Sequence, residues 1–80
     1  MKHRYFMADD GRHNLLVEYT TDGAEHEYHV IATTVRSKWK KLKHKKKVKY
    51  WFIKNMPQCI EIDSSDAVMI LLRSDLHQSK

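Results

Sequence analysis

Apolar and polar residues alternate along much of the first 35 positions, a pattern that predicts β-strands. The stretches concerned are 2–8, 14–20 and 25–35, and the last is rich in β-branched and aromatic residues. An Asp-Gly pair follows each of the first two, and Gly11 and Gly23 can supply the positive φ angle that a tight hairpin turn needs. The sequence therefore predicts an antiparallel meander of three strands.

Between 36 and 47 the spacing of apolar residues lengthens. Val35, Trp39 and Leu42 recur at i, i+4 and i+7, which predicts a helix whose remaining surface carries lysines. Like charges at i and i+4 cost about 0.2–0.5 kcal/mol per pair, so this helix would be weak until an anion neutralised it. The alternative is a long hairpin whose strands meet near His44, although no Gly, Asn or Asp stands there to make a tight turn.

The remaining chain predicts two strands and a helix. Residues 48–54 read as a strand covered on both faces, with Val48, Tyr50 and Phe52 on one side and Trp51 and Ile53 on the other. Residues 55–58 contain the only proline and turn the chain, and 59–62 alternate as a short strand with Ile60 and Ile62 inward.

The final helix is expected to begin at Ser64 or Ser65, which can cap it, with Asp66 in its first turn. Its buried stripe would contain Val68, Leu71 and Leu72, and residues 75–80 would be frayed. The predicted fold class is α+β: a small antiparallel sheet of about five strands, a C-terminal helix, and a basic helix before the fourth strand.

The length of 80 residues indicates one domain, 1–80, because so short a chain cannot bury two separate cores. A single cysteine, Cys59, excludes an internal disulfide and favours a reducing compartment. The sequence shows no signal peptide and no apolar run long enough to span a membrane. We therefore expect a cytoplasmic protein or, in a eukaryote, a nuclear one.

Charge is distributed unevenly along the chain. The basic segment, 36–54, holds ten cationic residues and no carboxylate. Outside it five cations face ten acids, so the formal net charge of +5 divides into +10 within the segment and −5 elsewhere. Such asymmetry predicts an anionic partner, and basic runs are typical of nucleic-acid footprints.

The leading hypothesis is a small nucleic-acid-binding module, for RNA or DNA, whose lysines contact backbone phosphates. Nine of the ten cations in the segment are lysine rather than arginine, which favours point-charge contacts and weak sequence selectivity. Trp39 or Trp51 could stack on bases, a contact worth about 1–3 kcal/mol per base. The candidate binding residues are Arg36, Lys38, Trp39, Lys40, Lys41, Lys43, His44, Lys45, Lys46, Lys47, Lys49 and Trp51.

Two binding alternatives belong to other classes. The chain could be a protein-binding regulator or inhibitor, resembling an antitoxin in role, that docks its basic face on an acidic partner or adds an edge strand to another sheet. It could also lie on an anionic membrane surface, with Trp39 and Leu42 inserted among the lipids.

We do not expect an enzyme, a metal site or a cofactor. The enzymatic alternative is a small metal-independent ribonuclease that uses His13, His44 or Glu18 beside the lysines. Six histidines are present, but His26 and His29 should point to opposite faces of a strand and so could not hold one ion together.

Overall fold

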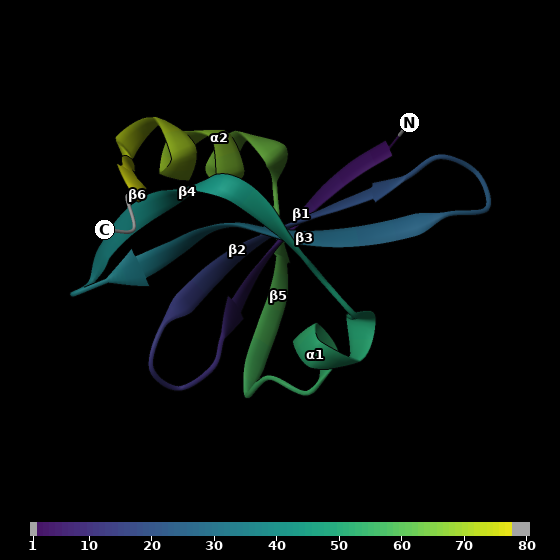
Figure 1. Cartoon of the computed structure of the whole chain (residues 1–80), viewed down its shortest axis with the longest axis horizontal. Helices are drawn as coiled ribbons and strands as arrows, with labels where there is room; N and C mark the ends of the chain where they lie inside the picture. Colours follow the sequence, from purple (N-terminus) through teal and green to yellow (C-terminus); the bar gives the residue numbers. More distant parts are fainter. Residues whose placement is uncertain (1, 78–80) are drawn as a thin grey trace.

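The computed structural model of this chain describes residues 2–77, which form a mixed sheet with one helix on each face (Figure 1). The described part contains six strands in the order β5-β1-β2-β3-β4-β6, all antiparallel to their neighbours except β6, which runs parallel to β4. The elements are β1 (Lys2–Asp9), β2 (Asn14–Thr21), β3 (His26–Val35), β4 (Lys38–Val48), α1 (Tyr50–Lys54), β5 (Gln58–Ile62), α2 (Ser64–Arg73) and β6 (Asp75–His77).

The α+β class, the antiparallel sheet and the C-terminal helix are confirmed. The first three strands form the predicted meander, and both Asp-Gly turns have the expected conformation, with φ of 93° at Gly11 and 87° at Gly23. In the first turn the Asp10 carboxylate accepts hydrogen bonds from the backbone N–H groups of Arg12 (2.8 Å) and His13 (2.7 Å). These bonds lower the pKa of Asp10 and hold the turn closed.

The predicted helix over 36–47 is wrong, because residues 38–47 belong to β4 and the two before them form a turn. In a strand, adjacent lysines point to opposite faces, and lysines on one face stand about 6.6 Å apart, so the repulsion expected of a lysine helix is reduced. The two apolar residues assigned to one helical stripe are also separated. Trp39 packs on the side of the sheet that carries α2, and Leu42 packs on the side that carries α1.

The hairpin alternative, with two strands meeting near His44, is also wrong, because β4 runs as one strand through His44 and pairs with β3 instead. β3 and β4 are joined by the two residues Arg36 and Ser37, with φ of 54° and 65°. Two successive positive φ values are typical of a type I′ turn, whose twist matches that of the flanking strands. The tight β3–β4 hairpin therefore depends on two side-chain-bearing residues held in a left-handed conformation that glycine or asparagine usually occupies.

The strand expected at 48–54 is wrong as well. Only Val48 belongs to a strand, and Tyr50–Lys54 forms the short helix α1. Asn55 ends this helix, since its backbone N–H (3.1 Å) and its side-chain amide (2.8 Å) both donate to the Trp51 carbonyl oxygen. A helix this short can turn few residues toward the sheet, so Ile53 is buried while Tyr50 and Phe52, expected in the core, are exposed.

Two apolar clusters lie on opposite sides of the sheet. We call the side packed against α1 the α1 face; its buried residues are Ala8, Val17, Val30 and Ile53. The other side, the α2 face, has Leu16, Ile31, Ala32 and Ala67 at its centre. Relative to β2, Ile31 is an extra residue in β3, which lets consecutive residues 31 and 32 face the same way. Toward β4 the pairing is also irregular there, but the extra residues belong to β4, where 42–45 stand opposite Ile31.

Details of the last third also differ from expectation. The N-cap of α2 is Asp63, without a side-chain capping bond, rather than Ser64 or Ser65. The helix turns Ala67, Ile70 and Leu71 toward the sheet and leaves Val68 and Leu72 exposed. Ile60 is 59% exposed, whereas Ile62 packs against the α2 face as predicted.

The chain end differs too. Residues 75–77 form β6 instead of fraying, and the part of the prediction that concerns 78–80 lies outside the described residues. Among the described residues, no helix has the length and apolar character needed to cross a membrane.

The left-handed β3–β4 turn makes a stability prediction. We expect Ser37→Gly to raise the free energy of unfolding by about 0.5–1 kcal/mol, because relief of the positive-φ strain exceeds the added entropy of the unfolded chain. Urea unfolding followed by tryptophan fluorescence would measure it. Ser65→Gly is the matched control: the same change in the first turn of α2 should lower stability, by up to about 0.5 kcal/mol. A Ser37→Gly protein less stable than the wild type would contradict the left-handed turn.

Candidate nucleic-acid interface

Strand alternation divides the basic segment between the two faces of the sheet. On the α2 face, Lys41 stands beside Ala32, and Lys45 and Lys47 reach carboxylates. On the α1 face, Lys46 lies beside Val30 and lines a hollow with Leu42 and Val48. The ten cations therefore do not form the single patch that the sequence suggests.

On the α2 face the protein neutralises part of its own charge. Lys45 Nζ lies 2.7 Å from Oε1 of Glu18, and Lys47 Nζ lies 3.4 Å from Oε1 of Glu27. Lys40, which pairs with Thr33 and so points to the α1 face, also has an interaction with another group. Among the residues that the structure describes, no acidic partner approaches Arg36, Lys38, Lys41, Lys43, Lys46, Lys49 or Lys54.

Glu18 is the most buried carboxylate of the α2 face, with 10% of its side chain exposed. Its Oε2 receives a hydrogen bond from the Tyr5 hydroxyl at 3.4 Å and lies 3.5 Å from His3 Nδ1. Burial alone would raise the pKa of Glu18, but the hydrogen bond and positive charge of Lys45, supported by His3, lower it overall. Glu18 is therefore an anion near neutral pH, held by groups from β1 and β4.

The α1 face combines lysines with exposed aromatic side chains. Trp51 is 61% exposed and Tyr50 56% exposed, both on the helix that follows β4 directly. Trp39, the other residue expected to stack on bases, packs against the α2-face core instead. Because Trp39 and Leu42 pack on opposite faces, they cannot insert together into a membrane surface as one stripe.

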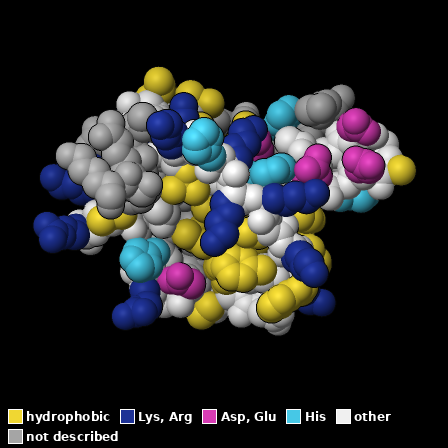
Figure 2. Space-filling model, viewed as in Figure 1, with side chains coloured by type: hydrophobic (Ala, Val, Ile, Leu, Met, Phe, Trp, Pro, Cys, Tyr) yellow, Lys and Arg dark blue, Asp and Glu magenta, His cyan; other side chains and the backbone are white. Residues whose placement is uncertain are grey.

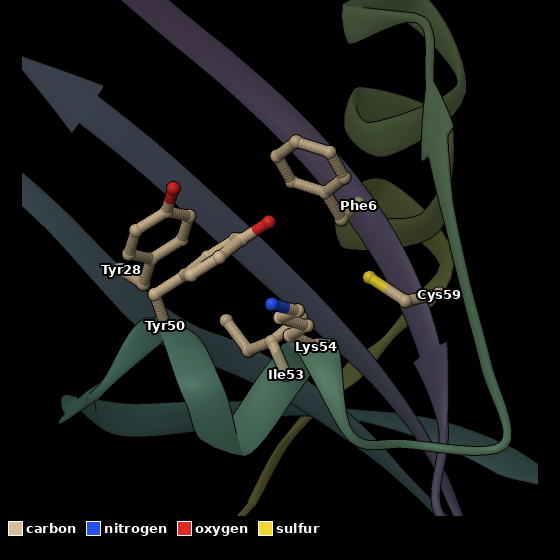
Figure 3. A pocket seen from close by; sticks show the side chains of 6 residues that line it. All are labelled: Phe6, Tyr28, Tyr50, Ile53, Lys54 and Cys59. Atoms are coloured by element: carbon tan, nitrogen blue, oxygen red, sulfur yellow. The ribbon is translucent and has the colours of Figure 1, made fainter.

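Two hollows flank α1. The first, of about 270 Å³, lies between α1 and strands β1, β3 and β5 and is lined by Phe6, Tyr28, Tyr50, Ile53, Lys54 and Cys59 (Figure 3). The second, of about 250 Å³, has Leu42, Val48 and Phe52 in its wall, with Lys46 and Asp10. Each hollow thus pairs an apolar floor with a lysine.

Aromatic rings continue from the first hollow across the sheet. Tyr50 lies 5.4 Å from Tyr28, ring centre to ring centre, and Tyr28 lies 4.9 Å from Tyr19. Tyr19 in turn stacks on His26 at 5.8 Å, and its hydroxyl is hydrogen-bonded to that ring. These four side chains, which we call the aromatic row, come from α1, β2 and β3 and run from the hollow toward the β2–β3 turn.

The acids gather at the far end of the aromatic row. Asp22, Glu25 and Glu27 line a small depression at the β2–β3 hairpin. In Figure 2 most of the visible acidic side chains lie at the end of the molecule where Figure 1 places this hairpin, while Lys and Arg border a central apolar area. On the face that Figure 2 shows, acidic side chains are therefore concentrated at the hairpin and basic ones elsewhere.

No family model, curated protein or solved structure matches this chain. Its function must be inferred from its own residues.

The residues of the ribonuclease alternative are not brought together. Glu18 is contacted, within the described residues, by His3, Tyr5 and Lys45. His13 lies in the β1–β2 turn, and His44 is exposed on β4. Neither has the convergent geometry with Glu18 that acid–base catalysis needs.

The histidines show no metal arrangement in the described part of the chain, where no group of three or more His, Cys, Asp or Glu side chains could hold an ion. His26 stacks on Tyr19 on the α1 face, and His29 stands opposite Glu18 in the β2–β3 register on the α2 face, so the two lie on opposite faces as predicted. His29 Nδ1 is buried without a hydrogen-bond partner in the described structure, and Nε2 lies 3.9 Å from Glu27.

Sequence reasoning missed the aromatic contributors to the α1 face. Phe6, Tyr19 and Tyr28 lie 8 or more positions before the basic segment, and only sheet pairing brings them near it. The available signal was the same-side placement of Tyr19 with Leu15 and Val17. It indicated an apolar face without showing that Lys46 and Lys54 border it.

The Glu18 cluster makes a pH prediction. Because the folded-state pKa of Glu18 lies below its ordinary value of 4.5, its stabilising contribution is complete above that pH and is lost as pH falls through the folded pKa. We expect Glu18→Gln to lower stability by about 1–2 kcal/mol near neutral pH, and the difference from wild type to shrink below about pH 4.5. Urea unfolding across a pH series would measure both.

Glu25→Gln, at an exposed turn position, is the control and should change stability by less than about 0.5 kcal/mol throughout. A Glu18→Gln protein whose deficit stayed constant into acid would show that the Glu18 charge does not contribute.

Proposed function

We propose that this chain is a nucleic-acid-binding module that holds backbone phosphates with the lysines of the α1 face. The observation that carries the proposal is that Lys46 and Lys54 line the hollows beside α1 and that Lys49 is the N-cap of α1, next to its exposed aromatic residues. These three lysines lack acidic partners in the described structure. Cations beside aromatic rings are the usual composition of single-strand binding surfaces.

The α1 face supports this role better than the α2 face. Lys45 and Lys47 on the α2 face already have carboxylate partners, so a phosphate would have to compete with Glu18 and Glu27 for them. On the α1 face Glu61 pairs with Arg4, and Asp10, which lines the second hollow with Lys46, accepts hydrogen bonds within the β1–β2 turn. Phosphates can therefore approach this face with less competition.

The type of cation indicates how selective the binding should be among nucleic-acid sequences. A lysine ammonium group contacts phosphate as a point charge and lacks the two-pronged geometry with which arginine reads guanine. Selectivity among sequences should be weak, and occupancy of the nucleic acid would itself be the function. The single cysteine fits a reducing compartment, and we place this activity in the cytoplasm or, in a eukaryote, the nucleus.

Salt dependence tests the proposal. If about five phosphates are neutralised, the logarithm of the binding constant should fall with the logarithm of salt concentration at a slope near −3.5 to −4.5. We expect Lys46→Gln with Lys49→Gln to reduce the size of this slope by about 1.4 on single strands, since each lost contact removes about 0.7. Fluorescence anisotropy with RNA and DNA oligomers between about 50 and 200 mM salt would measure it.

The matched control removes the same charge elsewhere. Arg12→Gln with Arg73→Gln changes two exposed cations outside the basic segment and should leave the slope unchanged. If the slope fell equally in both double variants, the effect would depend on net charge alone and not on the α1 face. Absence of binding at low salt would overturn the proposal.

A protein partner is the second candidate, favoured by a different surface. β5 ends the described sheet, so its outer edge pairs with no described strand. Ile60 on this strand is apolar and 59% exposed. An open edge with an exposed apolar side chain is where an added strand from another protein would pair.

The two candidates make separate predictions. If a protein is the partner, a stoichiometric complex should survive nuclease treatment and be lost in Ile60→Lys, which puts a charge on the open edge. It should persist in the double variant of Lys46 and Lys49. Co-purification followed by light scattering would measure this, and loss of every partner on nuclease treatment would overturn the second candidate.

A further inference from the structure

The hollow beside α1 has the composition of a site for a flat, polarisable ring. Phe6, Tyr28 and Tyr50 supply aromatic walls, Ile53 supplies the floor, and Figure 3 shows the Lys54 ammonium group and the Cys59 sulfur directed toward the space that they surround. At about 270 Å³ it can take one ring system and is too small for a paired base step.

The ionisation states and free hydroxyl groups around the hollow suit an uncharged ring. The pKa of the Cys59 thiol is raised by burial, and the pKa of Tyr28 is raised by burial and by Tyr19 and Tyr50, so these groups are uncharged near neutral pH. No described residue forms a hydrogen bond with the Tyr28 or Tyr50 hydroxyl. Both hydroxyl groups can therefore form hydrogen bonds with the polar edge of a ligand.

Charge around the hollow favours an anionic backbone outside it. Arg4 forms two hydrogen bonds to the Glu61 carboxylate, and its guanidinium lies 5.6 Å from the centre of the Phe6 ring. Glu61 is thereby neutralised, while Lys54 has no acidic partner among the described residues. A ligand with a flat, uncharged ring and a negatively charged group beside it fits both the hollow and Lys54.

We propose that this hollow binds one unstacked base of a single-stranded nucleic acid, with the base against Tyr50 and the adjacent phosphate on Lys54. The proposal rests on the proposed function and narrows it to single strands, because a base within a duplex is stacked and paired and cannot enter. The next base would lie along the aromatic row, over Tyr28 and Tyr19.

The test compares a short thymine oligomer with an abasic oligomer of equal length and charge, by fluorescence anisotropy. We expect wild type to bind the base-bearing oligomer about 5- to 150-fold more tightly, with equal salt slopes for the two. Tyr50→Ala should reduce this preference by about 5-fold or more, because one base loses its ring partner. Tyr50→Phe should keep most of the preference because the ring remains. Leu72→Ala, an exposed residue of α2, is the control and should bind as wild type does.

Cys59 gives an independent readout because it is the only cysteine and lines the hollow. Its alkylation by iodoacetamide should be slowed by the thymine oligomer and not by the abasic one. Equal affinity for both oligomers with equal alkylation rates would overturn the base site and leave the proposed function standing. Failure of both oligomers to bind at low salt would overturn the proposed function itself.

Discussion

The pairing of β4 with β3 is the constraint on which the rest of the structure depends. It converts a run of lysines that would repel along a helix into a strand whose neighbours point to opposite sides. It also sends Trp39 into one core and Leu42 into the other, so the same backbone bonds complete both apolar clusters. Without this pairing the sheet would lose a wall of each core, and the basic segment would have no fixed orientation.

The sequence was sufficient wherever the deciding interactions are local. The meander of β1 to β3 follows from alternation and two Asp-Gly turns, and α2 from a short amphipathic stretch after Asp63. It was misleading between 36 and 54, where helix and strand were interchanged. The β3–β4 turn uses Arg36 and Ser37 where turn statistics favour Asn and Gly, and the aromatic residues of α1 have strand propensity that the burial of Ile53 overrides.

The candidate interface was predictable in its charge but not in its geometry. Residue counts identify the cations. Only the fold shows that two of them form ion pairs with Glu18 and Glu27, whereas Lys46 remains accessible. The same applies to the aromatic side chains. Trp39 and Trp51 looked equivalent in sequence, but one fills a core and the other is exposed, and Tyr28 becomes relevant because β3 carries it to the edge of the hollow.

The position of β5 has a consequence for synthesis of the chain. β1 pairs with β2 through a short hairpin, but its other neighbour, β5, comes some 50 residues later in the sequence. During translation, β1 therefore has an unpaired edge until Gln58–Ile62 has left the ribosome, and closing this long loop is the least local step of sheet formation. The nascent protein is most open to wrong strand pairing in that interval, and arrival of β5 ends it.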